Sequence, residues 1–298
     1  MIISPSAISP YKIPTFQSGG APFVGLLDTY PSAAAAYSVR RLSSTYAGSA
    51  MEVRIDTVGH PLYDIGFDEN GDLDTADLIS KAAGNDAFVV TWYDQSGNAY
   101  NATQTTTSAQ PQIVSSGVIS NKNSKPAIDF SGGNWELDAN AAASEFAGTD
   151  VNFESFSVLS GDGSSNKEFF SLAAASGNTT SLQLRTNGID FLRVFIRDDA
   201  SANNDKITTT QITNQSLVSV LGTPSDYNIY VDGTADAGNP NTASLGLCSF
   251  AKATIGNDAR AISAYWEGTI QELVFYNTDQ SSNRTGIETN QNDYYTIY

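Results

Sequence analysis

The chain has 298 residues, of which 40% are hydrophobic and only 16% are charged. Lys and Arg number 15 against 32 Asp and Glu, so the formal net charge is −17 at pH 7. No basic stripe exists to neutralise phosphates, which excludes nucleic acid and anionic membranes as expected partners. A single cysteine, Cys248, and a single histidine, His60, exclude an internal disulfide and a Cys/His zinc site. A Ser-His-Asp triad would need His60, and the position of His60 in a Gly59–Pro61 turn disfavours such a triad.

Residues 1–30 differ in composition from everything that follows them. Prolines at intervals force extended backbone and remove ladder donors, yet the apolar residues between them are too many for a flexible linker. We expect an extended Pro-rich arm that anchors the protein in an assembly, with packing on its own domain as the alternative. The first residues lack a basic stretch and an uninterrupted apolar core, so no cleaved secretory signal is expected. No apolar run reaches the ~18 residues of a membrane span.

Residues 31–298 are expected to form one domain. Ser32–Tyr46 predicts a short helix, because Pro31 and Ser32 can begin it and the alanines that follow can propagate it. Arg40 and Arg41 are notable in a chain with few cations, and we expect one of them to pair with a buried or partly buried carboxylate. Ala50–Ile55 predicts a strand, with its apolar residues on one face by period-two alternation.

The densest cluster of oxygen ligands lies between residues 68 and 74. Two interpretations are open: a bound calcium ion, or the capping of a helix over Ala76–Ala83 by Asp74 or Thr75, with Gly84 as its end. The order of residues departs from an EF-hand, since the glycine comes too early and no glutamate closes the loop. Capping is favoured, and calcium is the one cofactor that the sequence leaves open. Its candidate ligands are Asp68, Asn70, Asp72 and Asp74.

The stretch Thr91–Asn98 joins an apolar run to a cluster of turn-forming residues. Trp92 and Tyr93 follow the run, and the chemistry then changes to Asp, Ser, Gly and Asn, which favour tight turns. Such a sequence is typical of a sandwich corner and also of a carbohydrate subsite, in which rings stack on sugars while carboxylates and amides bind hydroxyls. The structural corner is favoured. If a sugar binds, the candidate residues are Tyr93, Asp94 and Asn98, followed by Trp135 and Trp266.

Short strand-like segments separated by turn residues fill the rest of the chain. Their number and spacing favour an antiparallel sandwich over βαβ units. Val231–Thr234 predicts a hairpin, because Asp-Gly suits a type I′ turn. A polar segment, Gln280–Asn292, is expected to be helical or irregular. The predicted strands are Gln112–Val114, Ala127–Phe130, Ser155–Ser160, Glu168–Ala173, Ser181–Arg185, Phe191–Ile196, Leu217–Leu221, Asn228–Val231, Ala253–Ile255 and Gly268–Tyr276.

Several local patterns occur in an order that resembles a known family. They are Arg40-Arg41-Leu42, Tyr46-Ala47-Gly48, Asp64-Ile65-Gly66-Phe67, Trp92-Tyr93-Asp94-Gln95-Ser96-Gly97-Asn98, Lys125 to Phe130, Asn228 to Gly233 and Trp266 to Tyr276. The order resembles the concanavalin-A/laminin-G type sandwich, in the branch similar to the catalytic domain of family 54 α-L-arabinofuranosidases. The resemblance covers roughly residues 35–298. It implies an all-β, antiparallel jelly-roll β-sandwich with a few short helices.

The resemblance also bears on activity. Retaining enzymes of that family use a Glu nucleophile and an Asp acid about 5 Å apart. Phe191–Asp199 resembles the nucleophile's strand, but Arg197 or Asp198 stands where the Glu is expected. Asp258 could fill the acid's position, with Asp198, Asp199 or Glu267 as its partner. The family's disulfides are absent, so the sequence favours a protein without this activity and keeps the hydrolase as the alternative.

Domains of this branch without signal peptides resemble virion structural proteins of tailed bacteriophages. The resemblance implies a fibre, tail or head-decoration protein, located in the virion and homo-oligomeric, for example a trimer. The sandwich would contact host-surface glycans or other virion proteins, and residues 1–30 would attach it to the particle. A cytoplasmic scaffold without a ligand is a further alternative.

Overall fold

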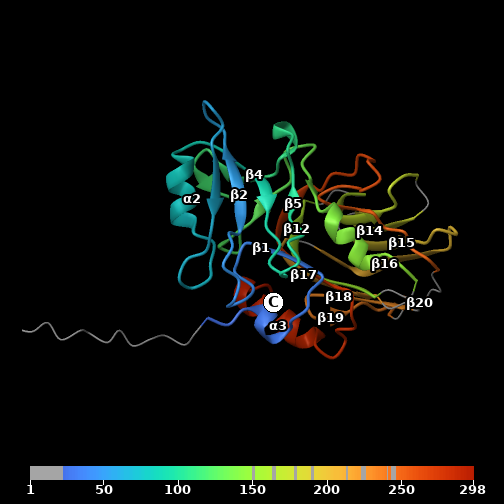
Figure 1. Ribbon diagram of the computed structural model, residues 1–298. Coiled ribbons are helices and arrows are strands. Elements are labelled where there is room, and N and C mark those ends of the chain that lie inside the picture. Colours follow the sequence, from blue (N-terminus) through green and yellow to red (C-terminus); the bar gives the residue numbers. More distant parts are fainter. Residues whose placement is uncertain are drawn as a thin grey trace, which may run out of the picture.

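The computed structural model describes residues 23–298, except 150–151, 163–165, 178–179, 189–190, 213, 223–225, 240 and 243–245. Within these residues the chain is mostly antiparallel β-structure with three short α-helices (Figure 1). None of the described helices has the length and apolar character needed to cross a membrane.

One sheet of the sandwich is built around two long central strands. β12 (Phe153–Gly161) and β22 (Gly268–Tyr276) pair antiparallel with each other. β22 also pairs with β1 (Ala35–Ser38), and β12 pairs with β17 (Ser216–Gly222). β18 (Asp226–Val231) completes this sheet beside β17, and the short β19 (Thr234–Ala235) and β20 (Asn241–Thr242) pair with β18.

The second sheet faces the first across the core. Its order is β11 (Leu137–Asp138), β21 (Lys252–Ile255), β13 (Glu168–Ala173), β14 (Ser181–Asn187), β15 (Phe191–Arg197) and β16 (Asn203–Gln211). Phe170 of β13 packs on Phe275 of β22, with ring centroids 4.3 Å apart, so aromatic side chains join the two sheets. All residues of β13 are buried, while β15 and β16 keep part of their other face accessible to solvent.

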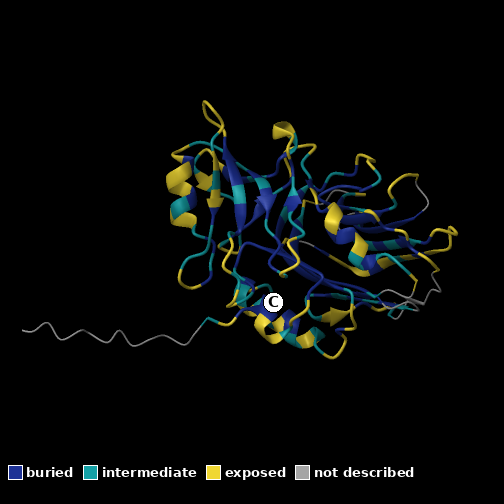
Figure 2. Ribbon diagram, viewed as in Figure 1, coloured by how far each residue is buried: buried dark blue, intermediate teal, exposed yellow. Residues whose placement is uncertain are grey.

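Smaller strands extend the fold on the side that carries α2. β2 (Met51–Ile55) pairs with β3 (Leu62–Ile65) and β4 (Ala87–Trp92), and β6 (Gln112–Ser115) pairs with β4. α2 (Thr75–Ala82) lies at the edge of this region, and its outer face is exposed in Figure 2. The remaining short elements are β5 (Ala102–Thr103), η1 (Thr107–Ala109), β7 (Val118–Ile119), β8 (Asn121–Lys122), β9 (Lys125–Pro126), β10 (Ile128–Asp129) and η2 (Asn140–Phe146).

The capping interpretation of residues 74–84 is confirmed. The Asp74 carboxylate accepts a hydrogen bond of 2.9 Å from the Asp77 N–H, which satisfies an orphan donor of the first turn. Ala83 ends the helix in the left-handed region, at φ +48, and Gly84 continues it at φ +87. The hairpin is confirmed too, because Asp232 (φ +50) and Gly233 (φ +72) have the two positive φ angles of a type I′ turn.

The helix predicted over Ser32–Tyr46 is wrong. Residues 35–38 form β1, in which Ala35 lies opposite Phe275 and Ser38 opposite Glu272. The helix propensity of the alanines is overridden because the small side chains let β1 pair with β22 in the interior, where all of its residues are buried. The sequence also missed β3 and β16. β16 is mostly polar, and few of its side chains are buried, so it lacks the regular alternation that predicts a strand.

The segment assigned to the N-terminal arm divides at residue 22, because residues 1–22 lie outside the described part of the chain. Its last residues contain α1 (Leu26–Thr29), in which Leu26 and Leu27 are buried. They share an apolar cluster with Ile287 of the C-terminal helix α3 (Arg284–Tyr295). This part of the predicted arm packs on the domain.

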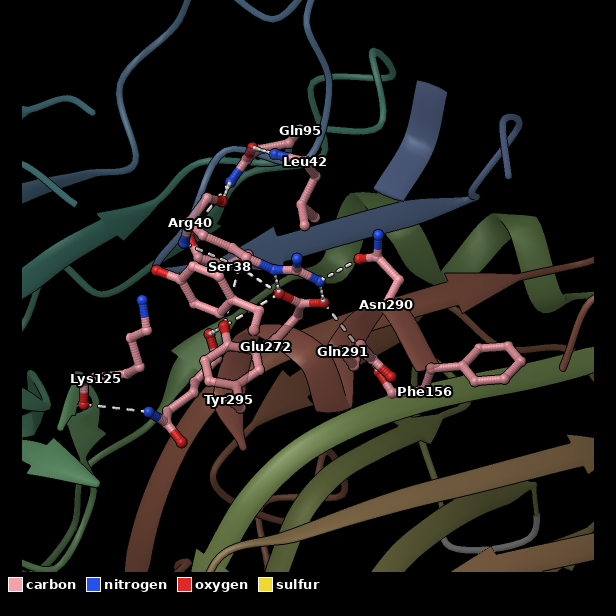
Figure 3. Close-up of polar contacts among 12 residues, drawn as sticks. Ser38, Arg40, Leu42, Gln95, Lys125, Phe156, Glu272, Asn290, Gln291 and Tyr295 are labelled. Carbon is pink, nitrogen blue, oxygen red and sulfur yellow. Dashed lines mark hydrogen bonds and ion pairs between the residues drawn. The ribbon is translucent and has the colours of Figure 1, made fainter. Parts of the chain in front are cut away.

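A buried ion pair confirms the prediction for Arg40 and Arg41. The Arg40 fork donates to both carboxylate oxygens of Glu272, from Nε at 2.7 Å and from Nη2 at 3.0 Å. Figure 3 shows Ser38 and Gln291 donating to the same carboxylate, and Asn290 accepting from Arg40. Every partner comes from β1, β22 or α3 or from the residues next to them, so the cluster joins the β1 segment and the helix α3 to the central strand β22.

Candidate functional site

The corner that follows Trp92 is held together by its own polar groups. The Asp94 carboxylate accepts hydrogen bonds from the backbone N–H of Ala36 (2.8 Å), Ser96 (2.9 Å) and Tyr100 (3.0 Å). The Ser96 hydroxyl donates to it as well. Asp94 is only 4% exposed, so its acceptor capacity is used to position backbone.

The neighbouring amides and rings act in the same way. Gln95 accepts from the Leu42 N–H and donates to the Arg40 carbonyl, while Asn98 donates to the carbonyls of residues 33 and 34. The Tyr93 hydroxyl donates to Asp64 at 2.7 Å, and this contact together with burial raises the pKa of Tyr93. Asp94, Gln95 and Asn98 hydrogen-bond to the 33–42 segment, which supports the structural interpretation of this corner. Tyr93 and Asn98 remain accessible, and their role in binding a sugar stays a prediction.

The two tryptophans proposed for sugar stacking differ in accessibility. Trp266 is 0% exposed and packs edge-on against Phe169, so the prediction that it stacks on a sugar is wrong. Its neighbour Gly268 has no room for a side chain against the indole nitrogen. Trp135 is half-buried and lies against Phe88; its neighbours Asn134 and Glu136 line a cavity, but Trp135 itself does not.

The acidic loop uses its carboxylates locally. Asp68 accepts from the N–H of Asn70 and of Asp72, while Asp72 contacts the Tyr294 hydroxyl and the Lys125 ammonium. Within the described residues no group of three or more His, Cys, Asp and Glu side chains is arranged to hold a metal ion. The calcium interpretation gains no support from these contacts.

The structure instead shows a polar cleft beside the second sheet. Two cavities, of ≈ 760 Å³ and ≈ 280 Å³, share Glu136, Asp138 and Tyr265 in their walls and therefore meet at these side chains. The larger extends toward η1 and the smaller toward Asp258. The other residues that line the two cavities are Gln104, Thr105, Thr106, Ser108, Ala109, Gly133, Asn134, Asn140, Lys252, Thr254, Asn257, Ala259 and Ala261.

Strand pairing explains why these residues meet. Asp138 of β11 lies opposite Thr254 of β21 on one side and Thr103 of β5 on the other. β21 ends at Ile255, and the next residue is Gly256, whose φ of +85 and contact with the Phe130 ring leave no space for a side chain. This turn sends the following residues across the end of the sheet. The Ser171 hydroxyl of β13 fixes them, donating to one backbone carbonyl and accepting from one N–H.

The cleft is acidic but its carboxylates are not equivalent. Burial raises the pKa of Glu136, an effect that the hydrogen bond from Asn257 (2.7 Å) opposes. The cleft walls desolvate Asp138 and raise its pKa, and nearby Lys252 lowers it. The half-buried Tyr265 ring lines both cavities together with these two carboxylates. The junction therefore combines an aromatic ring with hydrogen-bond acceptors.

Asp258, the predicted acid, lines the smaller cavity, but Arg260 holds its carboxylate. Arg260 donates from Nε to Asp258 at 2.9 Å and from a terminal nitrogen at 2.5 Å. The second carboxyl beside it is Glu168, which the sequence did not single out. Burial first, and then the neighbouring Asp258, raises the pKa of Glu168 well above its usual range. Glu168 is 0% exposed and lines neither of the two cavities, although Asp258 is its direct neighbour.

The predicted partners of Asp258 lie elsewhere. Asp198 follows β15, where its carboxylate accepts from the N–H of Ala202 and Gly246. Arg193 marks the level of Glu168, because each lies opposite Arg185, and Asp198 is five residues further along the strand. A strand rises ~3.3 Å per residue, so Asp198 lies about 16 Å along the strand from the level of Glu168. That separation is too large for the two carboxyl groups of a retaining enzyme. Asp199 binds Thr180 and Ser249, and Glu267 pairs with Lys167.

A third, smaller cavity lies on the solvent face of β14 and β15. It has a volume of ≈ 160 Å³ and is lined by Gln183, Arg185, Arg193, Phe195 and Arg260. Sequence reasoning missed it, although one signal was present. Phe191, Arg193, Phe195 and Arg197 alternate with buried residues along β15, so aromatic rings and guanidinium groups share one face of the strand.

Comparison with known proteins agrees with this fold. Residues 138–283 match the family model for the concanavalin A-like lectin/glucanases superfamily. A search of curated proteins gave no match. The structure of a family 54 α-L-arabinofuranosidase soaked with a cyclic sulfate inhibitor is similar, with a TM-score of 0.62 and 16% identity. An arabinofuranosidase complexed with arabinofuranosyl-α-1,2-xylobiose gives a TM-score of 0.60 and 16% identity.

Both alignments cover 87% of this chain and 62% of the other, so the chain spans less than two thirds of those enzymes. The protein therefore contains a concanavalin A-like jelly-roll domain, and its fold is similar to that of the family 54 enzymes. The fold class predicted from the sequence is confirmed. At this identity the likeness concerns the fold, and function has to be argued from the cleft itself.

Proposed function

We propose that the protein is a glycan-binding jelly-roll protein that holds saccharides in the cleft around Glu136, Asp138 and Tyr265 without hydrolysing them. The observation that carries the proposal is the junction of two cavities at walls that share one aromatic ring and two carboxylates. Sugar rings stack on aromatic faces, and carboxylates accept hydrogen bonds from their hydroxyls. An uncharged or cationic ligand suits the acidic walls.

The state of the two neighbouring carboxyl groups favours binding over hydrolysis. A retaining mechanism needs a nucleophile that reaches the anomeric carbon and an acid able to give its proton to the leaving group. Glu168 is fully buried, and both oxygens of Asp258 already accept from Arg260. The hydrolase remains the second candidate because these two carboxyl groups are direct neighbours beside the cleft.

The biological setting that we propose is the bacteriophage virion. This setting rests on the sequence resemblance. In it, the protein forms a homo-oligomer whose sandwich faces host-surface glycans or other virion proteins. Attachment to the particle is assigned to residues 1–22, because Leu26 and Leu27 already pack on the domain. Deleting residues 1–22 should abolish incorporation into particles and leave glycan binding intact. Incorporation at the wild-type level would refute the assignment.

Glycan binding can be tested with a panel of bacterial surface polysaccharides and arabinoxylan oligosaccharides, followed by titration calorimetry on any ligand found. Asp138→Asn and Tyr265→Ala should each weaken binding at least tenfold. Glu69→Gln serves as the control, because Glu69 is an exposed acidic residue of the distant acidic loop. Binding that is unchanged in both cleft variants would place the glycan elsewhere and refute the proposal.

The hydrolase alternative has its own assay. Incubation with an aryl α-L-arabinofuranoside should give no turnover above the uncatalysed rate. Turnover that disappears in both Asp258→Asn and Glu168→Gln, with folding unchanged by circular dichroism, would establish the enzyme and overturn the non-hydrolytic proposal. Loss in only one of the two variants would still overturn it, and would assign the chemistry to that carboxyl alone.

A further inference from the structure

The small cavity on β14 and β15 has a character opposite to that of the acidic cleft. Its lining includes the guanidinium groups of Arg185, Arg193 and Arg260, together with the Gln183 amide and the Phe195 ring. These arginines come from two strands and from the loop after β21, in a chain whose net charge is −17. A positive pocket in so acidic a molecule requires an explanation.

Two of the three arginines are neutralised by partners within the protein. Arg193 donates from two nitrogens to both oxygens of Asp205, at 2.7 and 2.5 Å. Arg260 holds Asp258 in the same bidentate manner. Such pairs fix a planar fork in one orientation. They form two rigid walls of the pocket.

Arg185 is different. It is half-buried, and it makes no hydrogen bond or ion pair with any residue that the structure describes. Arg193 lies directly opposite it on β15, so a like charge is its neighbour across the strands. Desolvation, and then Arg193, lowers the pKa of Arg185.

The acidic groups around Arg185 attract it, but none of them makes an ion pair with it within the described residues. Asp205 and Asp258 are each committed to another arginine. Glu168 lies opposite Arg185 on β13; burial and then Asp258 raise the pKa of Glu168, an effect that Arg185 opposes. One Glu168 oxygen has no hydrogen-bond partner within the described structure. The Arg185 fork therefore lines the pocket without a bidentate pair to any described carboxylate.

Apolar surface lies beside the fork. The guanidinium carbons of Arg193 and Arg197 lie 5.6 and 6.0 Å from the centroid of the half-buried Phe195 ring. The Gln183 amide, oriented with its oxygen toward Arg260, accepts from that guanidinium at 2.7 Å and so belongs to the wall. A ligand that pairs with Arg185 would place its neighbouring atoms against Phe195, which suits a charged group attached to a ring and not an isolated ion.

We propose that this pocket binds the carboxylate of an acidic sugar residue, with the Arg185 fork as its main partner and the Phe195 ring beneath the sugar. The inference rests on the proposed glycan-binding function and specifies its ligand class as acidic saccharides. Neutral sugar residues of the same chain would occupy the cleft around Tyr265, where Asp258 and Arg260 lie between the two cavities.

The experiment compares a glucuronic-acid-containing oligosaccharide with its carboxyl-reduced counterpart by titration calorimetry on the full chain. We expect the acidic form to bind at least tenfold more tightly, and this preference to shrink as salt is raised. Arg185→Gln should remove the preference and leave binding of the reduced form unchanged. Arg185→Lys, which keeps the charge but lacks the fork, should retain only part of it. Lys81→Gln, on the exposed face of α2, is the matched control and should bind as the wild type does.

The outcomes separate the two proposals. Equal binding of both oligosaccharides, or an acidic preference that survives in Arg185→Gln, overturns the inference and leaves glycan binding standing. Inorganic phosphate that competes as well as the acidic oligosaccharide would show a simple anion site and also overturn it. If no saccharide of either kind binds, the proposed function itself fails. A melting temperature of Arg185→Gln within ~2 °C of the wild type shows that the variant is folded.

Discussion

Arg40 and Arg185 show two ways in which this protein places a guanidinium group in its β-structure. Arg40 is 7% exposed, and its fork meets the fully buried Glu272, whose two oxygens also accept from Ser38, Gln291 and Tyr295 (Figure 3). The ion pair holds the pKa of Glu272 below its usual range. Arg185 is more accessible, and no described residue pairs with it.

The difference separates a structural site from a candidate binding site. A buried charge costs free energy unless its partners are complete, so a cluster as fully bonded as that of Arg40 serves the fold. A half-buried charge without a partner gains nothing for the fold and is retained at a cost. The comparison predicts opposite responses to mutation: removing a partner of Arg40 harms stability, while removing Arg185 harms binding.

The largest effect is expected for Glu272→Gln. The substitution leaves the Arg40 charge buried without a counter-charge, and breaking such a pair typically costs about 3–5 kcal/mol of unfolding free energy. Urea denaturation at pH 7 measures the loss. The double variant Arg40→Met/Glu272→Met should recover much of it, because neither charge then remains. A single variant as stable as the wild type would show that the cluster does not hold β1 and α3 to β22.

The same pair fixes a pH dependence. The pKa of Glu272 is lowered in the folded state, so its contribution to stability is present above the unfolded-state pKa and is lost as the pH falls through the folded-state pKa. The wild type should therefore lose stability in acid, and Glu272→Gln should lose less of it between pH 5 and pH 3. A parallel loss in both proteins would contradict the assignment.

The second effect concerns the corner after β4. Asp94→Ala removes one carboxylate that accepts from three backbone N–H groups, two of them in turns, and leaves buried donors unsatisfied. We expect a loss of about 3 kcal/mol, measured by urea denaturation. Asp94→Asn, which keeps one oxygen acceptor, should lose less. If both variants unfold like the wild type, the corner is not structural.

The sequence predicted the Asp94 corner and the fold class because their signals are local. Turn formers after an apolar run, an Asp-Gly hairpin and an Asp helix cap each act over a few residues, and the structure confirms them. It also predicted that Arg40 or Arg41 meets a buried or partly buried acid. It could not name Glu272, since the pairing depends on how β1 lies against β22.

The predictions that failed concern features that depend on contacts between residues far apart in the sequence. The alanines of the 32–46 segment form β1, because pairing with β22 outweighs local helix propensity. The cleft joins β5, β11, β21 and the loop after β21, and the arginine pocket joins three separate segments, so no single window of sequence contains either. The aromatic and Arg alternation along β15 was the one local signal, and it showed a shared face without showing that Arg185 lay beside it.

A third, smaller effect tests a buried carboxyl that lacks a cationic partner. Glu154 is 0% exposed, and burial raises its pKa to about 7. Between its unfolded-state pKa and pH 7 the native state therefore binds a proton that the unfolded chain releases, and stability falls as the pH rises. Glu154→Gln removes this charge, while its amide oxygen can still accept from the Gln280 N–H. We expect the variant to be more stable than the wild type by about 2 kcal/mol at pH 8 and equal to it at pH 4.5, measured by urea denaturation at both pH values. A gain that is the same at both would refute the titration of Glu154.

The smallest effect completes the comparison with Arg40. Arg185→Gln removes a charge that faces Arg193 across the strands, and with it the attraction of Glu168 and Asp205, but no hydrogen bond or ion pair with a described residue is lost. We expect the unfolding free energy to change by no more than about 0.5 kcal/mol, with a slight gain because the like-charge repulsion disappears. Lowering the salt concentration should enlarge that gain, since screening weakens the repulsion in the wild type. A loss as large as that of Glu272→Gln would mean that Arg185 is a structural arginine with an internal partner, and the distinction between the two arginines, together with the acidic-sugar pocket built on it, would fall.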